Sequence, residues 1–466
     1  MHRYDDATET LGQAVLAYTR QRLRLDPVPL DGPRSAQELT GSVGQTITEE
    51  GLGSAALDLF TEKLAPACIS IDHPRYLSFI PCAPTEAATL FDLVVGASSI
   101  YGGSWLEGAG AVYAENQALR WLADLAGFGP GAGGVFVPGG TVGNLSALVA
   151  ARDSARRAGR LAPSARGVVA TTEHSHSSIV SAAEVMDAEL LPVHPDAAGR
   201  LTGDGLRRAV EAAGPEVAQR LFAVVATAGT TNLGIVDDLA SVAPVCRELG
   251  AWLHVDGAYG GAGLAAPSVR SRFDGIEQAD SFVVDPHKWL FAPFDCCALI
   301  YADPDLARAA HTQKAGYLDV LTDAPDFNPS DYAVGLTRRA RGLPFWFSLA
   351  THGTRAYTEA IERTLAVARH AAAEVRRRVY LELIAEPDLT VVAFRRIGWT
   401  PQRYKVWSDN LLAANFAFVV PTVHEGETVA RFAVVNPRTT EADISNNGPV
   451  CSDRSVPQPD RDGEIG

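Results

Sequence analysis

The sequence predicts an α/β protein with a mostly parallel central β-sheet and helices on both faces of that sheet. Between residues 135 and 285, short apolar runs alternate with helical segments, one run for each helix, as in a series of strand–helix–strand units. The runs are apolar at almost every position, which is typical of strands buried on both sides. Because open sheets of this kind bind ligands at the carboxyl ends of their strands, we expect the functional site there.

The composition limits the kinds of protein that this chain can be. Its 466 residues are too many for one compact core and predict two or three domains. A net charge of −15 without a basic tract argues against nucleic acid and anionic membranes as partners. No apolar run approaches the roughly 20 residues that span a bilayer, and the N-terminus lacks the apolar core of a signal peptide. The six cysteines show neither a zinc spacing nor a disulfide framework, so we expect a soluble cytoplasmic protein with small-molecule partners.

The chain begins with a helical segment that we place at residues 1–70. Apolar residues at helical spacing predict helices over 7–25 and 51–65, separated by a break at Pro27 and Pro29. We then expect a helix over 85–98, a loop that holds Trp105 and Glu107, and a long helix that contains 115–125.

Residues 71–352 are expected to form the large domain, which holds the sheet. The predicted strands are 135–138, 168–171, 221–227, 251–256 and 281–284, and a helix over 239–249 has Asp237 and Asp238 as its N-cap. Residues 297–301 would be the strand that closes the sheet. Residues 303–334 lack periodicity and are rich in Asp, Pro, Gly and Ala, so they would form a mobile loop.

The remaining residues predict a small α/β domain at 353–444 and a tail at 445–466. A helix that begins within 338–348 leads into this domain, and it is followed by a helix over 357–376 and by strands at 382–385, 390–395, 417–421 and 429–435. The tail is polar and contains Pro, Asn, Asp and Gly, so we expect it to be disordered.

Lys288 is the residue around which the predicted site is arranged. Pro286 ends the apolar run 281–284, because proline cannot donate to a sheet ladder, so Lys288 follows at the carboxyl edge of the sheet. Trp289 could exclude water, and a partly dry cleft would lower the pKa of the lysine and make its amine nucleophilic toward an aldehyde. Asp256 ends the preceding strand, so an acid and an amine would meet at one edge.

Pyridoxal phosphate is a cofactor that needs this pair, because a lysine holds its aldehyde and an aspartate keeps its pyridine nitrogen protonated. HVDGAYGG at 254–261 and DPHKWL at 285–290 together resemble the signature of the group II pyridoxal-phosphate decarboxylases. This family includes the aromatic-L-amino-acid, histidine, glutamate and 2,4-diaminobutyrate decarboxylases. Taken alone, the two residues could also be a buried loop aspartate and a surface lysine.

The resemblance covers about residues 65–445 and carries several expectations. It implies the aspartate-aminotransferase-like fold, which is fold type I, and pyridoxal 5'-phosphate as the cofactor. It also implies a homodimer in which the active site is shared between subunits and the N-terminal helices pack on the partner subunit. From its sequence alone, that N-terminal segment could equally be an ordinary cap on its own chain.

A glycine turn precedes the helix that follows strand 135–138. Such a turn exposes backbone N–H groups to an anion, and the helix dipole adds to the attraction. This suits the phosphate of the cofactor, with Gly140 and Thr141 as donors. The resemblance adds Asn144 to the same loop.

The resemblance implies contacts on both faces of the cofactor ring. His176 directly precedes a Ser-Ser pair, so it would stack on the pyridine ring and contact the substrate carboxylate, whereas Ala258 would pack on the opposite face. Thr231 would meet the phenolic oxygen or the stacking histidine, or it could cap a turn, and His287 joins the cofactor set. His174 and His176 could suggest a metal, but no further ligand stands at a suitable spacing, so we expect none.

HPRYLSFIP at 73–81 resembles the segment that lines the substrate side of the cavity in this family. Phe79, Ile80 and Pro81 match its pocket positions, although they could also be ordinary core residues. Because this wall is apolar and Arg75 is the one basic residue in it, we expect an aromatic or otherwise apolar amino acid as substrate. The alternative is decarboxylation of an acidic or diamino acid such as glutamate or 2,4-diaminobutyrate.

A loop tyrosine completes the predicted catalytic set of Lys288, Asp256, His176 and Tyr317. In the family this tyrosine protonates the substrate carbon after carbon dioxide leaves, and an ungapped alignment assigns the role to Tyr317, with Tyr332 as a competing candidate. Related aldehyde synthases carry phenylalanine instead, so Tyr317 favours simple decarboxylation. A lyase of the sphingosine-phosphate type normally carries a membrane anchor, for which we find no segment. A non-catalytic cofactor-binding scaffold would be expected to have lost at least one of these residues.

Overall fold

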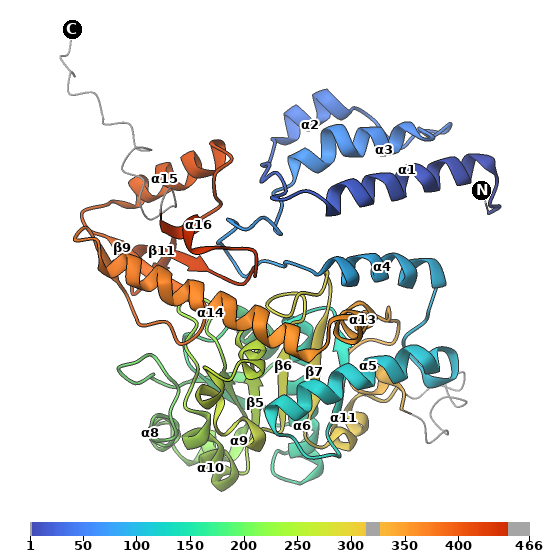
Figure 1. Cartoon of the computed structure of the whole chain (residues 1–466). Coiled ribbons are helices and arrows are strands. Elements are labelled where there is room, and N and C mark those ends of the chain that lie inside the picture. Colours follow the sequence, from blue (N-terminus) through green and yellow to red (C-terminus); the bar gives the residue numbers. More distant parts are fainter. Residues whose placement is uncertain (1, 314–326, 446–466) are drawn as a thin grey trace.

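The computed structural model describes residues 2–313 and 327–445. The predicted tail therefore lies almost wholly outside the described residues. The described chain contains an N-terminal group of helices, a seven-stranded sheet flanked by helices, and a four-stranded sheet near the C-terminus (Figure 1). The α/β fold class expected from the sequence is confirmed.

The seven-stranded sheet forms the centre of the molecule. Its strand order is β1-β7-β6-β5-β4-β2-β3, and all its pairs are parallel except those of β7, which runs antiparallel to both neighbours. The carboxyl ends of β1, β2, β4, β5 and β6 therefore meet at one edge. The strands are β1 (Gly133–Val137), β2 (Val168–Thr171), β3 (Glu189–Pro192), β4 (Leu221–Thr227), β5 (Trp252–Asp256), β6 (Ser281–Val284) and β7 (Cys297–Tyr301).

β7 lies inside the sheet, between β6 and β1. The prediction that residues 297–301 close the sheet is therefore wrong. Residues 285–296 connect β6 to β7 without a helix, whereas the crossover between parallel strands usually contains one. The chain consequently turns back and runs antiparallel beside β6.

Successive residues of each strand face two different hydrophobic cores. Along β4, Val224 and Ala226 belong to the core covered by α5 (Trp105–Ala126), α8 (Gly203–Ala213) and α10 (Leu239–Leu249). Ala223 and Val225 belong to the core covered by α6 (Gly140–Arg157), α7 (Ser177–Val185) and α11 (Pro304–His311). Burial on both faces explains why the strand sequences are continuously apolar. The short α9 (Pro215–Arg220) connects α8 to β4.

The N-terminal helices stand apart from the large sheet (Figure 1). They are α1 (Asp6–Leu23), α2 (Ala36–Val43) and α3 (Ala55–Leu59), which continues into a π-helical turn at Phe60–Leu64. The helix predicted over 7–25 is confirmed, whereas α2 was not predicted. Its signal is the capping box of Ser35 and Glu38. α4 (Glu86–Ser98) follows, close to the predicted 85–98.

Two predicted loops contain helical residues. Trp105 and Glu107 belong to α5, because Ser104 caps this helix by accepting a hydrogen bond from the backbone N–H of Glu107. Within the predicted loop 303–334, Asp303 caps α11 and Pro304 occupies its first position. Both helix starts carry ordinary capping signals, and these signals were overlooked in the sequence.

The C-terminal part forms an antiparallel sheet beside a long helix. α13 (Leu343–His352) and α14 (Thr354–Arg376) precede it, and α15 (Pro401–Ala413) and α16 (Glu441–Ser445) lie between and after its strands. The order is β10-β11-β9-β8, with β8 (Leu381–Leu383), β9 (Val391–Arg396), β10 (Thr422–His424) and β11 (Glu427–Ala433). The strand predicted at 417–421 is wrong, since Phe418 forms an isolated bridge to Tyr76.

The domain boundaries expected at residues 70, 352 and 444 stay predictions. Within the two described ranges, no helix combines the length and the apolar character needed to cross a membrane.

Candidate active site

A cavity of about 380 Å³ lies at the carboxyl edge of the large sheet. Two larger cavities of the described chain, of about 570 and 630 Å³, have no lysine on their walls. The cavity at the sheet edge brings together most of the residues predicted from the sequence. These are Phe79, Ile80, Gly140, Thr141, Asn144, His176, Thr231, Asp256, Ala258, His287 and Lys288.

Two predicted residues are not among them. Pro81 is buried but, in the part of the chain that the structure describes, does not line the cavity. Tyr317 lies outside the described residues. Its competitor Tyr332 is buried in the core beside α6 and α11, where it stacks on Phe327 with ring centroids 4.3 Å apart. Tyr332 is therefore a packing residue and not a wall of the cavity.

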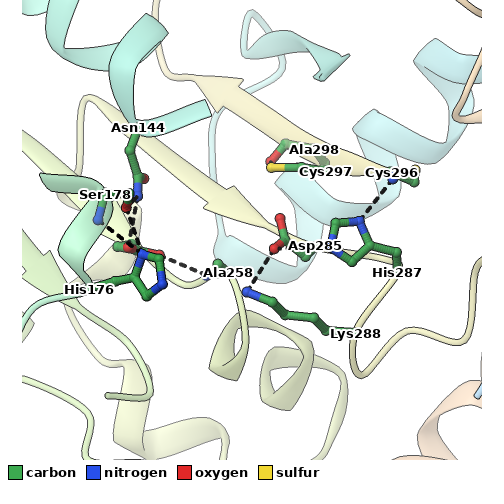
Figure 2. Close-up of polar contacts among 11 residues, drawn as sticks. Asn144, His176, Ser178, Ala258, Asp285, His287, Lys288, Cys296, Cys297 and Ala298 are labelled. Carbon is green, nitrogen blue, oxygen red and sulfur yellow. Dashed lines mark hydrogen bonds and ion pairs between the residues drawn. The ribbon is translucent and has the colours of Figure 1, made fainter. Parts of the chain in front are cut away.

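Lys288 directs its amine at a buried carboxylate (Figure 2). Its Nζ lies 2.8 Å from Oδ2 of Asp285, and 24% of its side chain is exposed. Burial lowers the pKa of Lys288, but the carboxylates of Asp285 and Asp256 more than offset burial and leave that pKa above its ordinary value. The expected depressed pKa is thus wrong for the chain without cofactor, because a neighbouring aspartate stabilises the ammonium.

Asp285 follows β6 directly and is 2% exposed. Besides Lys288 it faces His287, whose Nε2 lies 3.5 Å from Oδ2 of Asp285. Burial raises the pKa of Asp285, but the charges of Lys288 and His287 more than offset burial and hold the pKa below its ordinary value. Nδ1 of His287 accepts a hydrogen bond of 2.9 Å from the backbone N–H of Cys296, so the start of β7 fixes the orientation of this ring.

Asp256 is the last residue of β5, and two hydrogen bonds hold its carboxylate. Oδ1 accepts from the backbone N–H of Ala258 at 3.1 Å, and Oδ2 accepts from the amide of Asn144 at 2.9 Å. The same amide nitrogen also donates to Oγ of Ser178 at 2.9 Å. Asn144 lies one turn into α6, on its buried side, so its amide nitrogen orients Asp256 and makes no contact with the glycine turn.

His254 extends this arrangement into a directional chain of hydrogen bonds. The amide nitrogen of Asn144 donates to Asp256 and to Ser178, so the atom that faces His254 is its Oδ1, 2.9 Å from Nε2. An amide oxygen can only accept, so Nε2 of His254 is the donor. Nδ1 of His254 then accepts from Oγ of Ser281 at 2.8 Å, and that oxygen accepts from the indole N–H of Trp252 at 2.8 Å. Burial lowers the pKa of His254 to about 4, which keeps the ring neutral, as this chain of donors requires.

The same chain fixes the tautomer of His176. Oγ of Ser178 accepts from Asn144 and therefore donates to Nδ1 of His176 at 2.9 Å. The backbone N–H of Ser178 donates to the same nitrogen at 3.2 Å, so His176 also caps α7. With Nδ1 accepting, the ring hydrogen is on Nε2. His176 thus lines the cavity as a hydrogen-bond donor.

The turn between β1 and α6 has little room for side chains. Gly139 is the N-cap of α6 and Gly140 its first residue, so the free N–H groups of the first helical turn begin here. A Cβ at Gly140 would lie 3.1 Å from the Cβ of Ala258 and 3.4 Å from Oδ2 of Asp285. Since the N-terminus of a helix attracts anions, this geometry supports the predicted phosphate contacts of Gly140 and Thr141.

The substrate side contains a cation that the sequence analysis missed. Arg431 lines the cavity and donates a hydrogen bond of 2.9 Å from Nη2 to the carbonyl oxygen of Phe79. Burial lowers the pKa of Arg431 to about 10. Arg75, by contrast, lies over the ring of Phe416 with its Cζ 4.6 Å from the ring centroid. The expectation that Arg75 is the one basic residue near the substrate wall is therefore wrong.

Three buried polar atoms of cavity-lining residues have no hydrogen-bond partner among the described residues: Oγ1 of Thr227, Oδ1 of Asp285 and Nε of Arg431. Unpaired buried polar groups are costly, so these atoms indicate a polar ligand. A lysine, an aspartate and a helix N-terminus at one cavity fit pyridoxal phosphate, with its aldehyde, ring nitrogen and phosphate. Among the described residues, no three His, Cys, Asp or Glu side chains are grouped to hold a metal ion.

Asp285 and Arg431 differ in how far the sequence could have revealed them. Asp285 stands in the motif DPHKWL directly after a strand, and both signals were sufficient to name it. Arg431 lies in β11, far along the chain from the other site residues, and no local pattern links it to them. Tyr259 also lines the cavity and stacks on the buried Trp289, with ring centroids 5.5 Å apart, so Trp289 packs behind the site as expected.

Comparisons with known proteins agree with this geometry. The family model described as the pyridoxal-dependent decarboxylase conserved domain matches residues 54–397. An aromatic-L-amino-acid decarboxylase of Bacillus atrophaeus is 28% identical over 80% of this chain and 79% of its own length. An L-2,4-diaminobutyrate decarboxylase of Rhizobium meliloti (strain 1021) is 32% identical over 84% of this chain and 79% of its own length.

A solved structure agrees as well. The crystal structure of Oryza sativa TDC with PLP and tryptamine matches with a TM-score of 0.85 and 25% identity, over 95% of this chain and 96% of that one. The match extends over the large sheet and the C-terminal part together. The chain belongs to the family of pyridoxal-dependent decarboxylases and is an amino-acid carboxy-lyase that uses pyridoxal phosphate.

Proposed function

We propose that this enzyme converts an aromatic or otherwise apolar L-amino acid to the corresponding amine and carbon dioxide at the cavity on the edge of the large sheet. The observation that carries the proposal is the meeting of Lys288, Asp256 and His176 on one cavity wall. The three residues come from the ends of three different strands, and each has a fixed partner. Bound there, the cofactor supplies an electron-withdrawing ring that accepts the electron pair left by the departing carbon dioxide.

Each of these residues has a separate task in the proposal. Lys288 holds the aldehyde of the cofactor. Asp256 is already held by Asn144 and Ala258, so its carboxylate keeps a proton at the ring nitrogen without having to reorient. Such a preset charge costs no reorganisation when the reaction occurs.

His176 holds the substrate carboxylate in this proposal. Its tautomer carries the hydrogen on Nε2, because Ser178 occupies Nδ1, and an N–H donor is what a carboxylate requires. Tyr317, which lies outside the described residues, then gives a proton to the substrate carbon. Proton delivery by a placed side chain typically contributes about 10²–10⁴-fold to the rate.

The apolar substrate class rests on the wall formed by Phe79 and Ile80. Phe79 is 59% exposed, so its ring offers apolar surface to a bound side chain. An aromatic side chain would gain from stacking on such a ring. The relative from Bacillus atrophaeus acts on aromatic amino acids by its name, which agrees with this choice.

A second candidate is an acidic amino acid, and Arg431 favours it. Its Nε is buried and has no hydrogen-bond partner among the described residues, so a carboxylate on the substrate side chain could pair with it. A diamino acid is the remaining class, because one of the relatives is a 2,4-diaminobutyrate decarboxylase by name. The unpaired guanidinium nitrogen argues against a second amine close to it.

A panel of substrates separates these classes. We expect release of carbon dioxide from phenylalanine, tyrosine or tryptophan to exceed that from aspartate, glutamate and 2,4-diaminobutyrate. Preference for glutamate, together with its loss in Arg431→Met, would overturn the apolar class in favour of the acidic one. Lys288→Ala should abolish carbon dioxide release and the absorption band of the lysine-bound cofactor, whereas Lys405→Ala, on the surface of α15, should keep both.

We also propose that the enzyme acts as a homodimer in the cytoplasm. None of the α1 residues is buried by the described chain, and Leu11 and Leu16 on this helix are 40% and 50% exposed. Further exposed apolar side chains lie on α4, among them Leu93 and Val94. A second copy that covers these helices would remove this apolar surface from water.

A further inference from the structure

Asp285 lies at a corner of the cavity where two parts of the proposed cofactor site meet. Its Oδ2 is 2.8 Å from Nζ of Lys288, and its Oδ1 is buried and accepts no hydrogen bond from any described residue. Both of its oxygens also lie against the glycine turn, since a Cβ at Gly140 would be 3.4 Å from Oδ2 and 3.6 Å from Oδ1. One carboxylate therefore touches both the lysine and the turn proposed for the phosphate.

This position creates a conflict of charge when the cofactor binds. A phosphate monoester carries about −1.5 to −2 charges at pH 7, and it would arrive at the N-terminus of α6, beside Asp285. Two like charges in a buried site repel strongly, because water does not screen them.

The same binding event removes the partner of Asp285. The amine of Lys288 condenses with the cofactor aldehyde, so that a carbon–nitrogen double bond forms and one water molecule leaves. The nitrogen then carries at most one hydrogen in place of three. Even as a protonated imine it keeps a single N–H, so the ammonium that pairs with Asp285 no longer exists. In the chain without cofactor, that ammonium is a main reason why the pKa of Asp285 lies below its ordinary value despite burial.

The other groups around Asp285 do not replace this ammonium. On its own segment, His287 has a pKa lowered by burial, so it is a weak source of positive charge. From β7, the thiol of Cys297 hydrogen-bonds to Asp285 and lowers the pKa of that carboxyl, but burial raises the pKa of the thiol well above its ordinary value, so it brings no charge. From β5, Asp256 adds a further negative charge near Lys288. From α6, Gly140 lies against Asp285 and brings no side chain.

We propose that Asp285 takes up one proton from solvent when pyridoxal phosphate binds, and that the resulting carboxylic acid donates a hydrogen bond from its unpaired oxygen to the phosphate. One proton leaves the solvent and one O–H bond forms on Asp285. The inference depends on the proposed assignment of this cavity as the cofactor site. Cofactor affinity would then fall as pH rises, because ionised Asp285 repels the phosphate.

Calorimetry of the full-length chain without cofactor tests this inference. Pyridoxal 5'-phosphate and pyridoxal are titrated in two buffers of different ionisation enthalpy at pH 8, where the free phosphate is a dianion. Reaction at Lys288 is common to both compounds, so the difference in proton uptake between them reports the effect of the phosphate. For the native chain we expect pyridoxal phosphate to take up about one proton more than pyridoxal, and for Asp285→Asn we expect no such difference.

The variants differ in affinity as well. Between the pKa of Asp285 in the free chain and its higher pKa in the loaded enzyme, the dissociation constant of the native chain for pyridoxal phosphate, relative to that for pyridoxal, should rise about tenfold per pH unit. Asp285→Asn keeps a donor without a charge, so this dependence should vanish. Asp285→Ala keeps neither, so it should also lose the pH dependence but bind pyridoxal phosphate more weakly than Asp285→Asn at pH 8.

A phosphorus NMR spectrum of the loaded native chain locates the proton. We expect the shift of a phosphate dianion, since the proton is on Asp285; the shift of a monoanion would overturn the proposal. Equal proton uptake in the native chain and in Asp285→Asn would also overturn it. Neither the comparison of pyridoxal phosphate with pyridoxal in the native chain nor this spectrum depends on the folding of a variant. Failure of the site assignment itself would appear separately, as a lysine-bound absorption band that survives in Lys288→Ala.

Discussion

At the scale of single residues, the site contains two carboxylates in opposite surroundings. Asp256 is bound by the neutral donors Asn144 and Ala258, whereas Asp285 is paired with the amine of Lys288. In Figure 2, the contacts among Asn144, Ser178 and His176 lie apart from the Lys288–Asp285 pair. In the proposed function, the first arrangement preserves a charge through the reaction. We propose that the second loses its partner when the cofactor binds, so the two aspartates should respond differently to substitution.

The neutral state of His254 predicts a dependence of stability on pH. Its pKa is lowered from 6.5 to about 4, so between these pH values the folded chain binds fewer protons than the unfolded chain. Stability therefore rises with pH across this window and is lost on acidification through it, by roughly 3 kcal/mol at most. We expect urea unfolding of the cofactor-free chain at pH values from about 7 to about 4.5 to show this loss.

His254→Gln provides the comparison for this measurement. Its amide can donate to Asn144 but cannot titrate, so the variant should lose this part of the pH dependence. Burial raises the pKa of Asp237 to about 7, and a raised carboxyl pKa lowers stability as pH rises, which opposes the effect of His254. Because Asp237 is present in both proteins, their difference isolates His254. Parallel pH curves would contradict the prediction.

We expect the loop tyrosine predicted from the sequence to decide the product. Tyr317→Phe would remove the proposed proton donor, so we expect oxygen to attack the substrate carbon and yield aldehyde, peroxide and ammonia in place of amine. Peroxide and aldehyde assays on the purified variant measure this change. Tyr332→Phe is the matched control, because Tyr332 is a buried packing residue and its variant should still produce amine. An unchanged amine product in Tyr317→Phe would show that the wrong tyrosine was chosen.

At the scale of elements, a buried ion pair connects the segment before α13 to α5 and β1. Arg338 binds Glu115 through two hydrogen bonds of 2.8 and 3.1 Å, and its Nη2 donates to the carbonyl oxygen of Phe136 at 3.1 Å. Glu115 also accepts from the backbone N–H of Gly342 at 2.8 Å. β1 leads directly into the glycine turn, so this pair supports the strand that positions the proposed phosphate site.

Removing one partner of this pair should destabilise the fold. Glu115→Ala leaves Arg338 buried without its carboxylate, and loss of one partner of a buried pair typically costs about 3–5 kcal/mol. Chemical denaturation gives the change in the free energy of unfolding. The double variant Glu115→Leu with Arg338→Met removes both charges and should recover part of this loss. A single variant as stable as the native chain would show that water or a shift of the backbone already compensates.

At the scale of the whole molecule, the N-terminal helices form a layer apart from the body of the chain (Figure 1). α1 carries exposed leucines and has no residue buried by the described chain. A helix with this pattern gains little stability from its own subunit, because most helical stability in proteins comes from packing of an apolar face. This is the physical basis for the proposed dimer.

Substitution on α1 tests the dimer. Leu11→Asp combined with Leu16→Asp places charges on the exposed apolar surface and should shift the chain toward monomer in sedimentation experiments. It should also lower carbon dioxide release, if the site is shared between subunits. Val379→Asp is the matched control, because Val379 is 94% exposed and lies in the turn after α14. A native chain that sediments as a monomer would rule out the dimer directly.

Local sequence patterns were sufficient for the strands of the large sheet except β3, which was not predicted, and for most of the residues at their ends. β4 and β6 have the predicted boundaries, because an apolar run closed by a turn residue leaves few alternatives. Lys288 and Asp256 follow such runs, so their shared edge was predictable. The position of β7 was not predictable, since strand order depends on which segments can pair. The start of α5 was missed because a single capping serine outweighed a weak periodicity.

The sequence by itself determined the fold class, the cofactor family and the residues that stand at the strand ends, because each depends on local order along the chain. Tertiary structure alone decided that Asn144 serves Asp256, that His254 fixes the direction of the hydrogen bonds, and that Arg431 enters the cavity from a distant strand. It also decided the direction of the pKa shift of Lys288: the charge of Asp285 raises this pKa, whereas a dry pocket alone would lower it. The physical reason is that burial and charge act through space, between groups whose separation in sequence says nothing about their distance.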